Sequence, residues 1–522
     1  METGSVQVLV TMVAYMAVII CIGLYFAKRA NKNSEEYFIG GRGLGPWVAA
    51  MSAEASDMSG WLLMGLPGVA YWYGLADAAW TAIGLAVGTY LNWLLVSKRL
   101  RRYSYLAGNS ITVPDFFSNR FKETNKKPIM LIASLMILVF FSVYAGSCFV
   151  TCGKLFSTLF GANYQVMMIV GVIFVLAYTF LGGFLAESAS DFLQGIVMIF
   201  ALVMVLGFGT AAAGGVDAVV ANVSQIPGFV DFFGIASPVT DADGIQQAVG
   251  GVPQFGAAGA YGLITILSTL SWGLGYFGMP QVLLRFIAIR KVGELTRARR
   301  IAVVWVIISL CAAVLIGIVG RAMHPTELVT AGGAESIFII MAQTLFHPIL
   351  AGIVMAGILA ATISSSDSYL LIAASAVSKN IFQGIAKKDA TDKQVMLVSR
   401  ITLVVVALVG ATIAMDENSV IFTIVSFAWA GFGATFGPMM IFSLFWKRMT
   451  HIGAIVGMLG GAGMVFFWKL VLRPMGGVLG IYELGPAFLF SCILIVVVSL
   501  ATKPPSMEIQ NEFDAVKNLK AE

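Results

Sequence analysis

Long apolar runs dominate the hydrophobic pattern of the chain. Most are close to the length of a helix that crosses a bilayer, which needs about 20 apolar residues. Charged residues or clusters of Gly, Pro and Asn separate one run from the next. The pattern predicts an all-α polytopic membrane protein with 13 transmembrane helices. The predicted helices lie near residues 6–27, 45–66, 74–97, 128–155, 163–185, 190–214, 259–284, 299–320, 336–378, 398–415, 419–445, 451–472 and 484–501.

Three segments depart from a simple succession of helices and short loops. The run at 336–378 is too long for one crossing, so we expect part of it to form an interfacial or external helix that leads into the membrane. The connection at 215–258 has acidic residues but no Lys or Arg, and we expect a loop or short external helices there, or a vestibule that attracts cations. Residues 1–501 are predicted as a single transmembrane domain. Residues 502–522 are predicted as a cytoplasmic tail that is either solvated or makes a regulatory contact.

The composition supports this assignment. Hydrophobic residues make up 59% of the chain and charged residues only 11%, whereas soluble domains average about 25% charged residues. A water-soluble enzyme of 522 residues is therefore excluded. Glycine occurs 56 times, which suits closely packed or locally broken membrane helices. The five cysteines lie in apolar runs and form no CxxC pair, so we expect no disulfide framework.

The distribution of Lys and Arg predicts how the chain is oriented. If alternate connections lie on alternate sides, 28 of the 32 basic residues fall on one side. The other side holds only Lys154, Arg321, Lys469 and Arg473. Cytoplasmic loops collect basic residues, so the amino terminus is predicted outside and the carboxyl terminus in the cytoplasm of a cell membrane. The same distribution argues against a nucleic-acid partner, although the net charge is +5.

Two of the predicted membrane helices, the second and the seventh, are interrupted by polar, Gly and Pro residues. Broken helices leave carbonyls and amides free to hold ions and substrates. The two lie five helices apart, as expected if residues of about 45–214 and 259–445 are inverted repeats that each begin with a broken helix. The interrupting residues are Ser52, Glu54, Ser56, Asp57, Ser59 and Gly60 in the second, and Ser268, Ser271, Gly273, Gly275, Gly278 and Pro280 in the seventh.

The second helix contains two carboxylates. Asp57 is near the middle of the membrane, where an ionised carboxylate costs at least about 2.5 to 3.5 kcal/mol. We interpret it as coordinating or supporting a cation; the alternative is that it caps the second half-helix by accepting from the amides of Ser59 and Gly60. Glu54 lies three residues earlier on a similar face, either with a role in coupling or beside an aqueous cavity.

The ninth run contains the serine-rich segment 364–368, which includes Asp367. Hard cations prefer oxygen ligands, so adjacent hydroxyls there can complete a site begun by the carbonyls of a broken helix. The alternative is that these hydroxyls bond back to carbonyls one turn earlier.

Aromatic residues suggest a substrate pocket. Trp272 and Tyr276 are four residues apart in the broken seventh helix, so we expect them to be stacked on one face. Tyr144 lies in a polar stretch of the fourth helix. Such rings can enclose a small apolar body while their N–H or O–H groups reach polar atoms. Asp191 begins the sixth helix and is either an exit gate for a cation or a helix cap.

Sequence motifs of other membrane chemistries are absent. The chain has no GxxxxGK[ST] phosphate loop, no DKTG phosphorylation motif and no TVGYG filter, which argues against an ATP-driven pump and a potassium channel of that kind. The three histidines are far apart in the sequence, which makes a His-based metal site improbable.

Four stretches of the chain carry motifs that are dense in Gly, Ser and aromatic residues. They are YFIGGRGLGPWVAAMSAEASDMSGWLLMGLPG, AYTFLGGFLAESASDFLQ, SWGLGYFGMPQVLLRFIAI and GILAATISSSDSYLL. With these stretches the chain resembles the sodium:solute symporter family, and in particular its proline-transporting branch, from the first helix to about residue 500. The resemblance implies a LeuT-like core of ten helices, preceded by one and followed by two, and Na⁺-coupled uptake of L-proline by alternating access rather than enzymatic activity.

The resemblance also implies the residues of the site. Asp57 and Arg42 match functionally sensitive residues of the family, and Asp191 matches a carboxylate linked to sodium passage toward the cytoplasm. The implied Na⁺ ligands are the backbone carbonyls of Ala55, Met58 and Ala361 and the hydroxyls of Ser364 and Ser365, and the implied proline pocket is lined by Ser59, Gly60, Tyr144, Trp272, Tyr276 and Pro280.

Glu54 and Asp367 depart from the pattern of the proline-transporting branch, which holds a small and a neutral residue there. These departures leave open a different coupling ion or a proton-sensitive step. The alternatives are Na⁺- or H⁺-coupled symport of another small organic solute and a transporter-like sensor, because one scaffold can host several functions.

Overall fold

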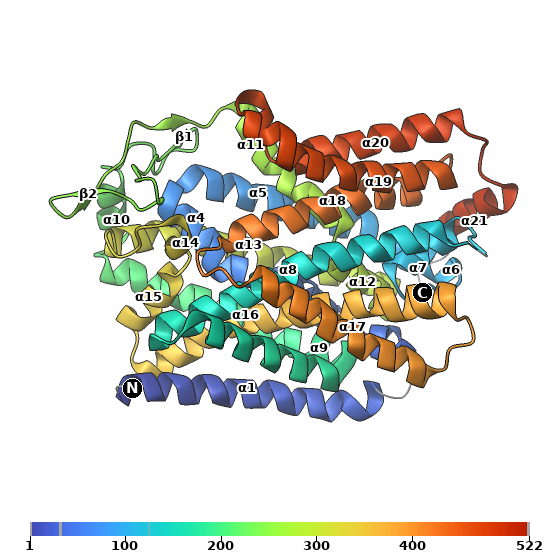
Figure 1. Ribbon diagram of the computed structural model, residues 1–522, viewed down its shortest axis with the longest axis horizontal. Coiled ribbons are helices and arrows are strands. Elements are labelled where there is room, and N and C mark those ends of the chain that lie inside the picture. The colour runs from blue at the N-terminus through green and yellow to red at the C-terminus, as the bar shows by residue number, and fades with distance from the viewer. Residues whose placement is uncertain (1–2, 31–33, 125, 519–522) are drawn as a thin grey trace.

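Apolar helices that run nearly parallel to one another form most of the molecule (Figure 1). The computed structural model describes residues 3–30, 34–124 and 126–518. Within them, ten helices are long and apolar enough to cross a membrane, and Tyr164–Phe180 and Leu263–Gly278 are shorter apolar helices. The all-α membrane architecture is thereby confirmed, while the count of 13 crossings stays a prediction. The helices of the first half are α1 (Thr3–Ala30), α2 (Ser34–Ile39), η1 (Gly40–Arg42), α3 (Pro46–Asp57), η2 (Trp61–Gly65), α4 (Leu66–Tyr73), α5 (Leu75–Leu91), η3 (Asn92–Val96), α6 (Ser97–Leu106), α7 (Val113–Arg120), α8 (Pro128–Phe160), α9 (Tyr164–Ala212) and α10 (Val216–Val223).

The second half repeats the pattern of long helices with local interruptions. Helices α16 and α18 lie at the centre of the bundle, because 83% of the apolar membrane-spanning stretch of each is buried. In α1, at the periphery, the buried share is 22%. The helices are α11 (Leu263–Leu270), η4 (Ser271–Gly278), α12 (Pro280–Ala288), η5 (Val292–Glu294), α13 (Leu295–Met323), α14 (Ala331–Ala334), α15 (Ile337–Leu345), α16 (Pro348–Ser375), η6 (Ala376–Ala386), α17 (Asp392–Ile413), α18 (Ile421–Phe445), α19 (His451–Phe467), η7 (Trp468–Leu472), η8 (Arg473–Met475), η9 (Gly477–Gly480), α20 (Leu484–Ala501) and α21 (Met507–Asn518).

The second and seventh predicted helices are both broken, as expected. The second consists of α3 and α4, with the break at Met58 (φ −83°, ψ 73°) and a π-helical turn, η2, after it. The seventh consists of α11 and α12, joined by the 3₁₀ segment η4 and an extended Met279. In each, proline at the first position starts a helical piece, Pro46 in α3 and Pro280 in α12, where its missing N–H costs no hydrogen bond.

Two helix boundaries in the structure differ from those that the sequence pattern predicts. The fifth and sixth runs form α9, which bends at Gly183 (φ 57°, ψ −170°), a backbone conformation that glycine adopts without a Cβ clash. The sixth helix therefore begins earlier than residue 190. The long ninth run is divided between α15 and α16, because Pro348 starts a new helix after the extended Phe346. This confirms the expectation of a separate helix leading into the long span.

The connection between α9 and α11 is a loop with little regular structure. It contains α10 and two small antiparallel sheets, in which β1 (Gly234–Ile235) pairs with β4 (Gly259–Ala260) and β2 (Ala248–Val249) with β3 (Val252–Pro253). It lies at the same end of the molecule as the start of α1, whereas α6, α7 and α21 lie at the other (Figure 1).

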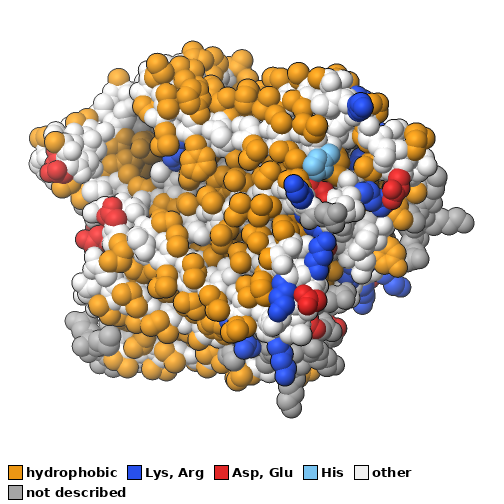
Figure 2. All heavy atoms as spheres, turned by 45° about the vertical axis from the view of Figure 1, so that its right-hand side comes forward, with side chains coloured by type: hydrophobic (Ala, Val, Ile, Leu, Met, Phe, Trp, Pro, Cys, Tyr) orange, Lys and Arg blue, Asp and Glu red, His pale blue; other side chains and the backbone are white. Residues whose placement is uncertain are grey.

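Charge separates along the same axis. Figure 2 shows a broad hydrophobic surface between one end, where Lys and Arg side chains gather, and the opposite end, where acidic side chains are seen. This distribution is typical of a bundle whose apolar middle contacts lipid. Lys32 and Lys520, two of the basic residues in the predicted cytoplasmic set, lie outside the described residues.

The carboxyl-terminal tail is folded rather than solvated. Helix α21 packs against α6, with the Phe513 ring 6.3 Å from that of Tyr103, and Phe513 is only 3% exposed. Its acidic residues pair with the basic end of the bundle, Glu512 with Lys122. The expectation of a solvated tail is therefore wrong for residues 507–518. This amphipathic helix packs its apolar face against α6, and basic side chains lie beside the contact.

Candidate ion and substrate site

The break in the second helix removes a carbonyl from the helical ladder. In an uninterrupted helix the Ser59 amide would bond the carbonyl of Ala55. It bonds the carbonyl of Asp57 instead, at 3.0 Å. Likewise, the Leu62 amide bonds the Ser59 carbonyl at 2.9 Å, although a regular helix would pair it with Met58. The carbonyls of Ala55 and Met58 thus lose the partners that helical geometry would give them.

Hydroxyls of α16 lie against this break. Ser364 Oγ is 2.7 Å from the Ala55 carbonyl oxygen, and Ser365 Oγ is 3.3 Å from the same atom. Ser364 Oγ also lies 3.2 Å from the Ala361 carbonyl. Each hydroxyl can turn its proton away and present a lone pair. Four of the five predicted Na⁺ ligands therefore meet at one point, and Met58 follows within the same break. A set of neutral oxygens on two helices fits a hard monovalent cation.

Asp57 connects the two broken helices. Its Oδ1 accepts a hydrogen bond from Gln281 Nε2 of α12 at 3.1 Å. Its backbone carbonyl accepts from the Trp61 indole at 3.2 Å. The carboxylate makes no capping bond to the following helical piece, so the helix-cap interpretation of Asp57 is not supported. The end of α3 is instead held to the start of α12.

In the seventh helix, side chains from neighbouring helices bond the carbonyls of the 3₁₀ segment. The Trp429 indole of α18 donates to the carbonyl of Trp272 at 2.8 Å. The Asn92 amide of η3 donates to the carbonyl of Tyr276 at 2.9 Å. These bonds occupy carbonyls that the tighter helix leaves poorly paired. The segment is therefore fixed in shape and presents its aromatic side chains rather than its backbone oxygens.

The prediction that Trp272 and Tyr276 stack on one helical face is wrong. Residues four apart share a face in an α-helix, but a 3₁₀ helix has three residues per turn, so they diverge by about 120°. Trp272 stacks on Tyr482, with centroids 5.0 Å apart, whereas Tyr276 meets Trp429 edge-on at 5.0 Å. Both rings nevertheless border the same tryptophan, because Trp272 lies 6.0 Å from Trp429.

A group of buried hydroxyls lies around the end of α3. Tyr144 packs on Tyr369 of α16, with ring centroids 4.3 Å apart. Their hydroxyls, and that of Tyr276, interact electrostatically with Asp57. Among the described residues, these three phenols and Ser59 Oγ form no hydrogen bond of good geometry, although the Tyr144 hydroxyl lies near those of Tyr369 and Ser59, and the Tyr276 hydroxyl lies near Asp57 and Thr89. Buried polar groups are normally paired, so this cluster is prepared for a polar ligand.

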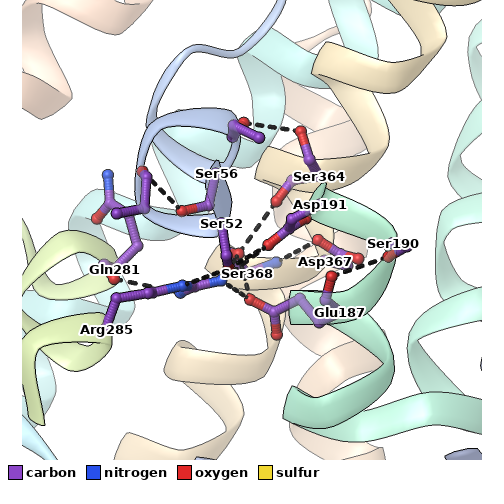
Figure 3. Close-up of polar contacts among 12 residues, drawn as sticks. Ser52, Ser56, Glu187, Ser190, Asp191, Gln281, Arg285, Ser364, Asp367 and Ser368 are labelled. Atoms are coloured by element: carbon purple, nitrogen blue, oxygen red, sulfur yellow. Dashed lines mark hydrogen bonds and ion pairs between the residues drawn. The ribbon is translucent and has the colours of Figure 1, made fainter. Parts of the chain in front are cut away.

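A network of charges lies next to the ion site, within hydrogen-bonding reach of Ser52 (Figure 3). Arg285 of α12 is fully buried and ion-paired with Glu187 and Asp191 of α9. Its guanidinium also donates to Ser52 Oγ at 3.0 Å and to Ser368 Oγ at 2.9 Å. The network therefore joins α3, α9, α12 and α16, and it connects both broken helices to the central span.

Asp191 belongs to this network and not to a helix end. Its Oδ2 accepts from Ser52 at 2.7 Å, and the residue lies well inside the helical piece that starts after Gly183. The helix-cap interpretation of Asp191 is therefore wrong. Asp367 is nearby on α16, where its Oδ1 accepts from the Ser368 amide at 2.7 Å. The network thus contains three carboxylates, those of Glu187, Asp191 and Asp367, and one guanidinium, that of Arg285.

The remaining predicted residues lie apart from the ion site. Arg42 reaches from η1 to the Ser110 carbonyl at 2.6 Å and to the end of α12. Glu54 accepts a hydrogen bond from the Trp93 indole at 3.0 Å, on a face of α3 other than the one that Ala55 presents to Ser364. Pro280 borders a small cavity shared with α7 and α16.

Gly60 is packed so closely that a Cβ would lie 2.2 Å from Thr151 Oγ1. The roles assigned to it, to Arg42, Glu54 and Pro280, and to the other predicted ion, substrate and coupling residues stay predictions.

Several residues of the site escaped the sequence reasoning. Arg285 ends an apolar run, so the distribution of Lys and Arg predicts it to be a cytoplasmic loop cation, and Glu187 lies at a similar position at the end of an apolar run. The available signal is a charge inside a motif-rich apolar stretch: Glu187 lies four residues before Asp191 in FLAESASDF, and Arg285 is the single charge in QVLLRF. Nothing in the local pattern distinguished Trp429 or Tyr369 from core aromatics.

A membrane bundle with two broken helices, one of which turns freed carbonyls toward hydroxyls of a central span, is typical of secondary transporters of the inverted-repeat, LeuT-like class. Solved structures agree with this fold. A substrate-bound, outward-open Na⁺-coupled sialic acid symporter matches with a TM-score of 0.73 and 18% identity, over 96% of this chain and 99% of that one. Mhp1, a nucleobase-cation-symport-1 family transporter in a closed conformation, matches with a TM-score of 0.52 and 10% identity, over 92% and 98% of the two chains.

Sequence comparisons define the family. The profile described as "Sodium:solute symporter family" matches residues 37–461. The "Sodium/proline symporter" of Staphylococcus aureus strain USA300 is 38% identical over 519 residues, covering 98% of this chain and 96% of that protein. The protein of the same name from strain NCTC 8325 matches equally. The chain belongs to the sodium:solute symporter family and is a transporter, not an enzyme.

Proposed function

We propose that this protein is a Na⁺-coupled symporter that takes up L-proline across the cell membrane by alternating access. The observation that carries the proposal is the contact between Ser364 and Ser365 of α16 and the freed carbonyl of Ala55 in the break of the second helix. Near full-length similarity to proteins named sodium/proline symporter supports the choice of ion and solute. The amino terminus lies outside and the carboxyl terminus inside the cell in this proposal, because most Lys and Arg then face the cytoplasm.

The Na⁺ site lies between two helices that can move against each other. Na⁺ bound by Ala55, Met58 and Ala361 carbonyls and by the two serine hydroxyls joins the second helix to α16. Such a bridge favours one arrangement of the helices over another, and only a ligand with different affinity for the two arrangements shifts their populations.

The proline pocket is assigned to the buried hydroxyls at the end of α3. The substrate carboxylate would accept hydrogen bonds from Ser59 and from the start of the following helical piece, where amides face outward. Tyr144 and Tyr276 supply phenol donors and ring faces for the pyrrolidine ring. Because Asp57 touches Gln281 of α12, a change at the ion site reaches the seventh helix directly. That contact gives a physical route for reciprocal coupling between the two ligands.

The energy source is the gradient of the coupling ion. One positive charge moving inward across 100 mV supplies about 2.3 kcal/mol. This corresponds to roughly a 50-fold accumulation of a neutral zwitterion, before the chemical Na⁺ gradient is added.

The test is uptake of labelled L-proline into proteoliposomes that contain the purified protein. One sample has an inward Na⁺ gradient, and its control has choline in place of Na⁺ at equal pH. We expect accumulation only with Na⁺. Accumulation driven by a pH gradient without Na⁺ would replace the ion assignment with proton coupling. If proline does not accumulate under either gradient, the proline assignment fails, and a competition panel of small solutes identifies the substrate.

A further inference from the structure

The first two turns of α13 carry three arginines, Arg297, Arg299 and Arg300. Positive charge at this position is unfavourable for the helix itself, because the amino-terminal end of a helix macrodipole stabilises anions. The single acidic residue between 286 and 301 in the sequence is Glu294, and its carboxylate pairs with Arg290 at 2.7 Å. Within the part of the chain that the structure describes, no carboxylate forms an ion pair with any of the three arginines. Their charges are therefore available to an anion from outside the chain.

Two of these arginines lie over exposed aromatic rings of neighbouring helices. The guanidinium carbon of Arg297 is 5.9 Å from the ring centroid of Trp47, in the first turn of α3. The guanidinium carbon of Arg299 is 5.6 Å from the ring centroid of Tyr90, at the end of α5. Trp47 is 49% exposed and Tyr90 is 43% exposed. Trp and Tyr gather where the apolar chains of a bilayer meet its headgroups, so the two rings place the guanidinium groups at headgroup depth.

An exposed apolar strip continues from the arginines along α13. At about 100° per residue, Arg300 lies between Arg297 and Arg299 around the helix axis. Val304 and Ile307 follow Arg297 and Arg300 by seven residues, which is nearly two turns, so they share the same side of the helix. Both are exposed, and exposed apolar side chains of a membrane-spanning helix contact acyl chains. The side of α13 that faces lipid therefore begins with a basic rim.

We propose that the arginine surface of α13 binds the headgroup of an anionic phospholipid. The surface consists of Arg297, Arg299, Arg300, Trp47 and Tyr90. The phosphate accepts hydrogen bonds from the guanidinium groups, whose planar forks match its geometry, and the acyl chains lie along the apolar strip. Phosphatidylcholine is a poorer ligand, because its own ammonium group is repelled by the arginines. The proposal requires only that the chain lies in a bilayer, so it does not depend on the transported ion or solute.

The site is built differently from a general excess of basic residues at one end of the molecule. Such an excess orients the chain in the membrane, but it does not require arginines to lie over exposed rings of two other helices. A basic surface between membrane helices is a known form of headgroup site. Here it joins α13 to α5 and to the first turn of α3, which is part of the broken second helix.

Native mass spectrometry of the purified protein tests the site. The protein is released from detergent micelles that contain equal amounts of phosphatidylglycerol and phosphatidylcholine with the same acyl chains. We expect the first retained lipid to be phosphatidylglycerol at least five times as often as phosphatidylcholine. Arg297→Gln, Arg299→Gln and Arg300→Gln combined should abolish this preference, because each change keeps a long polar side chain but removes one charge.

The matched control removes three charges from another basic segment. Lys387, Lys388 and Lys393 are exposed, before and at the start of α17. Their combined replacement by Gln lowers the net charge by the same amount and should leave the lipid preference unchanged. Gel filtration confirms that each variant is folded. If the triple arginine variant does not fold, Arg297→Gln alone, at an exposed position, should reduce the preference at least twofold.

The remaining outcomes separate a lipid site from other occupants. Soluble sn-glycerol 3-phosphate carries a phosphate without acyl chains, and at the same concentration it should leave phosphatidylglycerol bound. Displacement by this compound overturns the lipid assignment in favour of a free anion. Equal retention of the two lipids by unsubstituted protein, or an equal loss of preference in the lysine control, also overturns it. So does a dimer that the arginine substitutions dissociate, because a second copy of the chain would then cover this surface.

Discussion

The second and the seventh helix are both broken, but the backbone carbonyls at the two breaks have different partners. In the second helix, the Ala55 carbonyl leaves the helical ladder and meets two hydroxyls of α16, which a cation can displace or recruit. In the seventh helix, the carbonyls of Trp272 and Tyr276 are already bonded by Trp429 and Asn92. A carbonyl bonded only by hydroxyls can bind an ion once those hydroxyls turn and present lone pairs, whereas a carbonyl bonded by an indole or amide N–H stays occupied and fixes the backbone. In the proposed function, the first break therefore holds the ion and, through Ser59, one end of the substrate, whereas the second break contributes the ring of Tyr276.

The largest expected effect follows from removing the hydroxyls at the first break. Ser364→Ala with Ser365→Ala takes away two oxygens that face Ala55. Each bond to a charged group contributes about 1.5 to 3 kcal/mol, so the apparent Na⁺ affinity for proline uptake should fall at least about 100-fold. Uptake measured against Na⁺ concentration checks this.

Ser366→Ala is the matched control for the two serines. The Ser366 hydroxyl bonds back to the Thr362 carbonyl at 2.6 Å within the same helix. Its removal should leave the Na⁺ dependence close to that of the unsubstituted protein. Equal losses in Ser366→Ala and in the double variant would show that α16 needs its serines for folding rather than for the ion.

A smaller effect is expected from removing a hydrogen bond that holds the break in the seventh helix. Trp429→Phe keeps an aromatic ring but removes the indole donor to the Trp272 carbonyl. A buried carbonyl left unpaired costs about 1 to 3 kcal/mol, and the loosened 3₁₀ segment should raise the KM for proline about tenfold. The apparent Na⁺ affinity at saturating proline should change little.

Trp305→Phe provides the control for Trp429. The Trp305 indole donates to the Gly195 carbonyl at 3.1 Å, and this bond is also buried. Thermal unfolding should show a similar loss of stability in both variants, while only Trp429→Phe raises the KM. If Na⁺ affinity falls as much as proline affinity in Trp429→Phe, the division of roles between the breaks is wrong.

The link between the two breaks is expected to affect coupling more than either affinity. Gln281→Leu removes the hydrogen bond to Asp57. Coupling energies between sites are typically 1 to 3 kcal/mol, so the factor by which Na⁺ lowers the KM for proline should shrink about fivefold. Equilibrium binding of proline with and without Na⁺ measures this factor. An unchanged factor would mean that the coupling takes another route, and the Arg285 network is then the next to test.

The smallest effect is expected far from both breaks. Glu512→Gln removes an ion pair between α21 and Lys122 at the basic end of the molecule. Partly exposed ion pairs contribute about 0 to 1 kcal/mol, so uptake should stay within about twofold of normal at all Na⁺ concentrations. A larger loss would show that α21 influences the transport cycle.

Sequence reasoning located the chemistry of the first break better than its surroundings. A polar interruption and a serine run, both visible locally, predict freed carbonyls and adjacent hydroxyls, while the choice of Ala55, Ser364 and Ser365 is implied by the family resemblance. The Arg285 network was missed because its members come from four helices, and each is a single charge near the end of an apolar run. Trp272 and Tyr276 were placed on one face because the pattern does not distinguish 3₁₀ from α-helical turns.

The sequence by itself determined that the chain is a membrane bundle and that its second and seventh helices are broken. Hydrophobic length, Pro and Gly positions and the distribution of Lys and Arg are local properties, and the bilayer acts on each segment separately. Only the tertiary structure decided which freed carbonyls stay open and which are bonded, where Arg285 finds its carboxylates, and that α21 docks. These outcomes depend on side chains from distant segments meeting at one point, because a buried polar group is stable only with a partner.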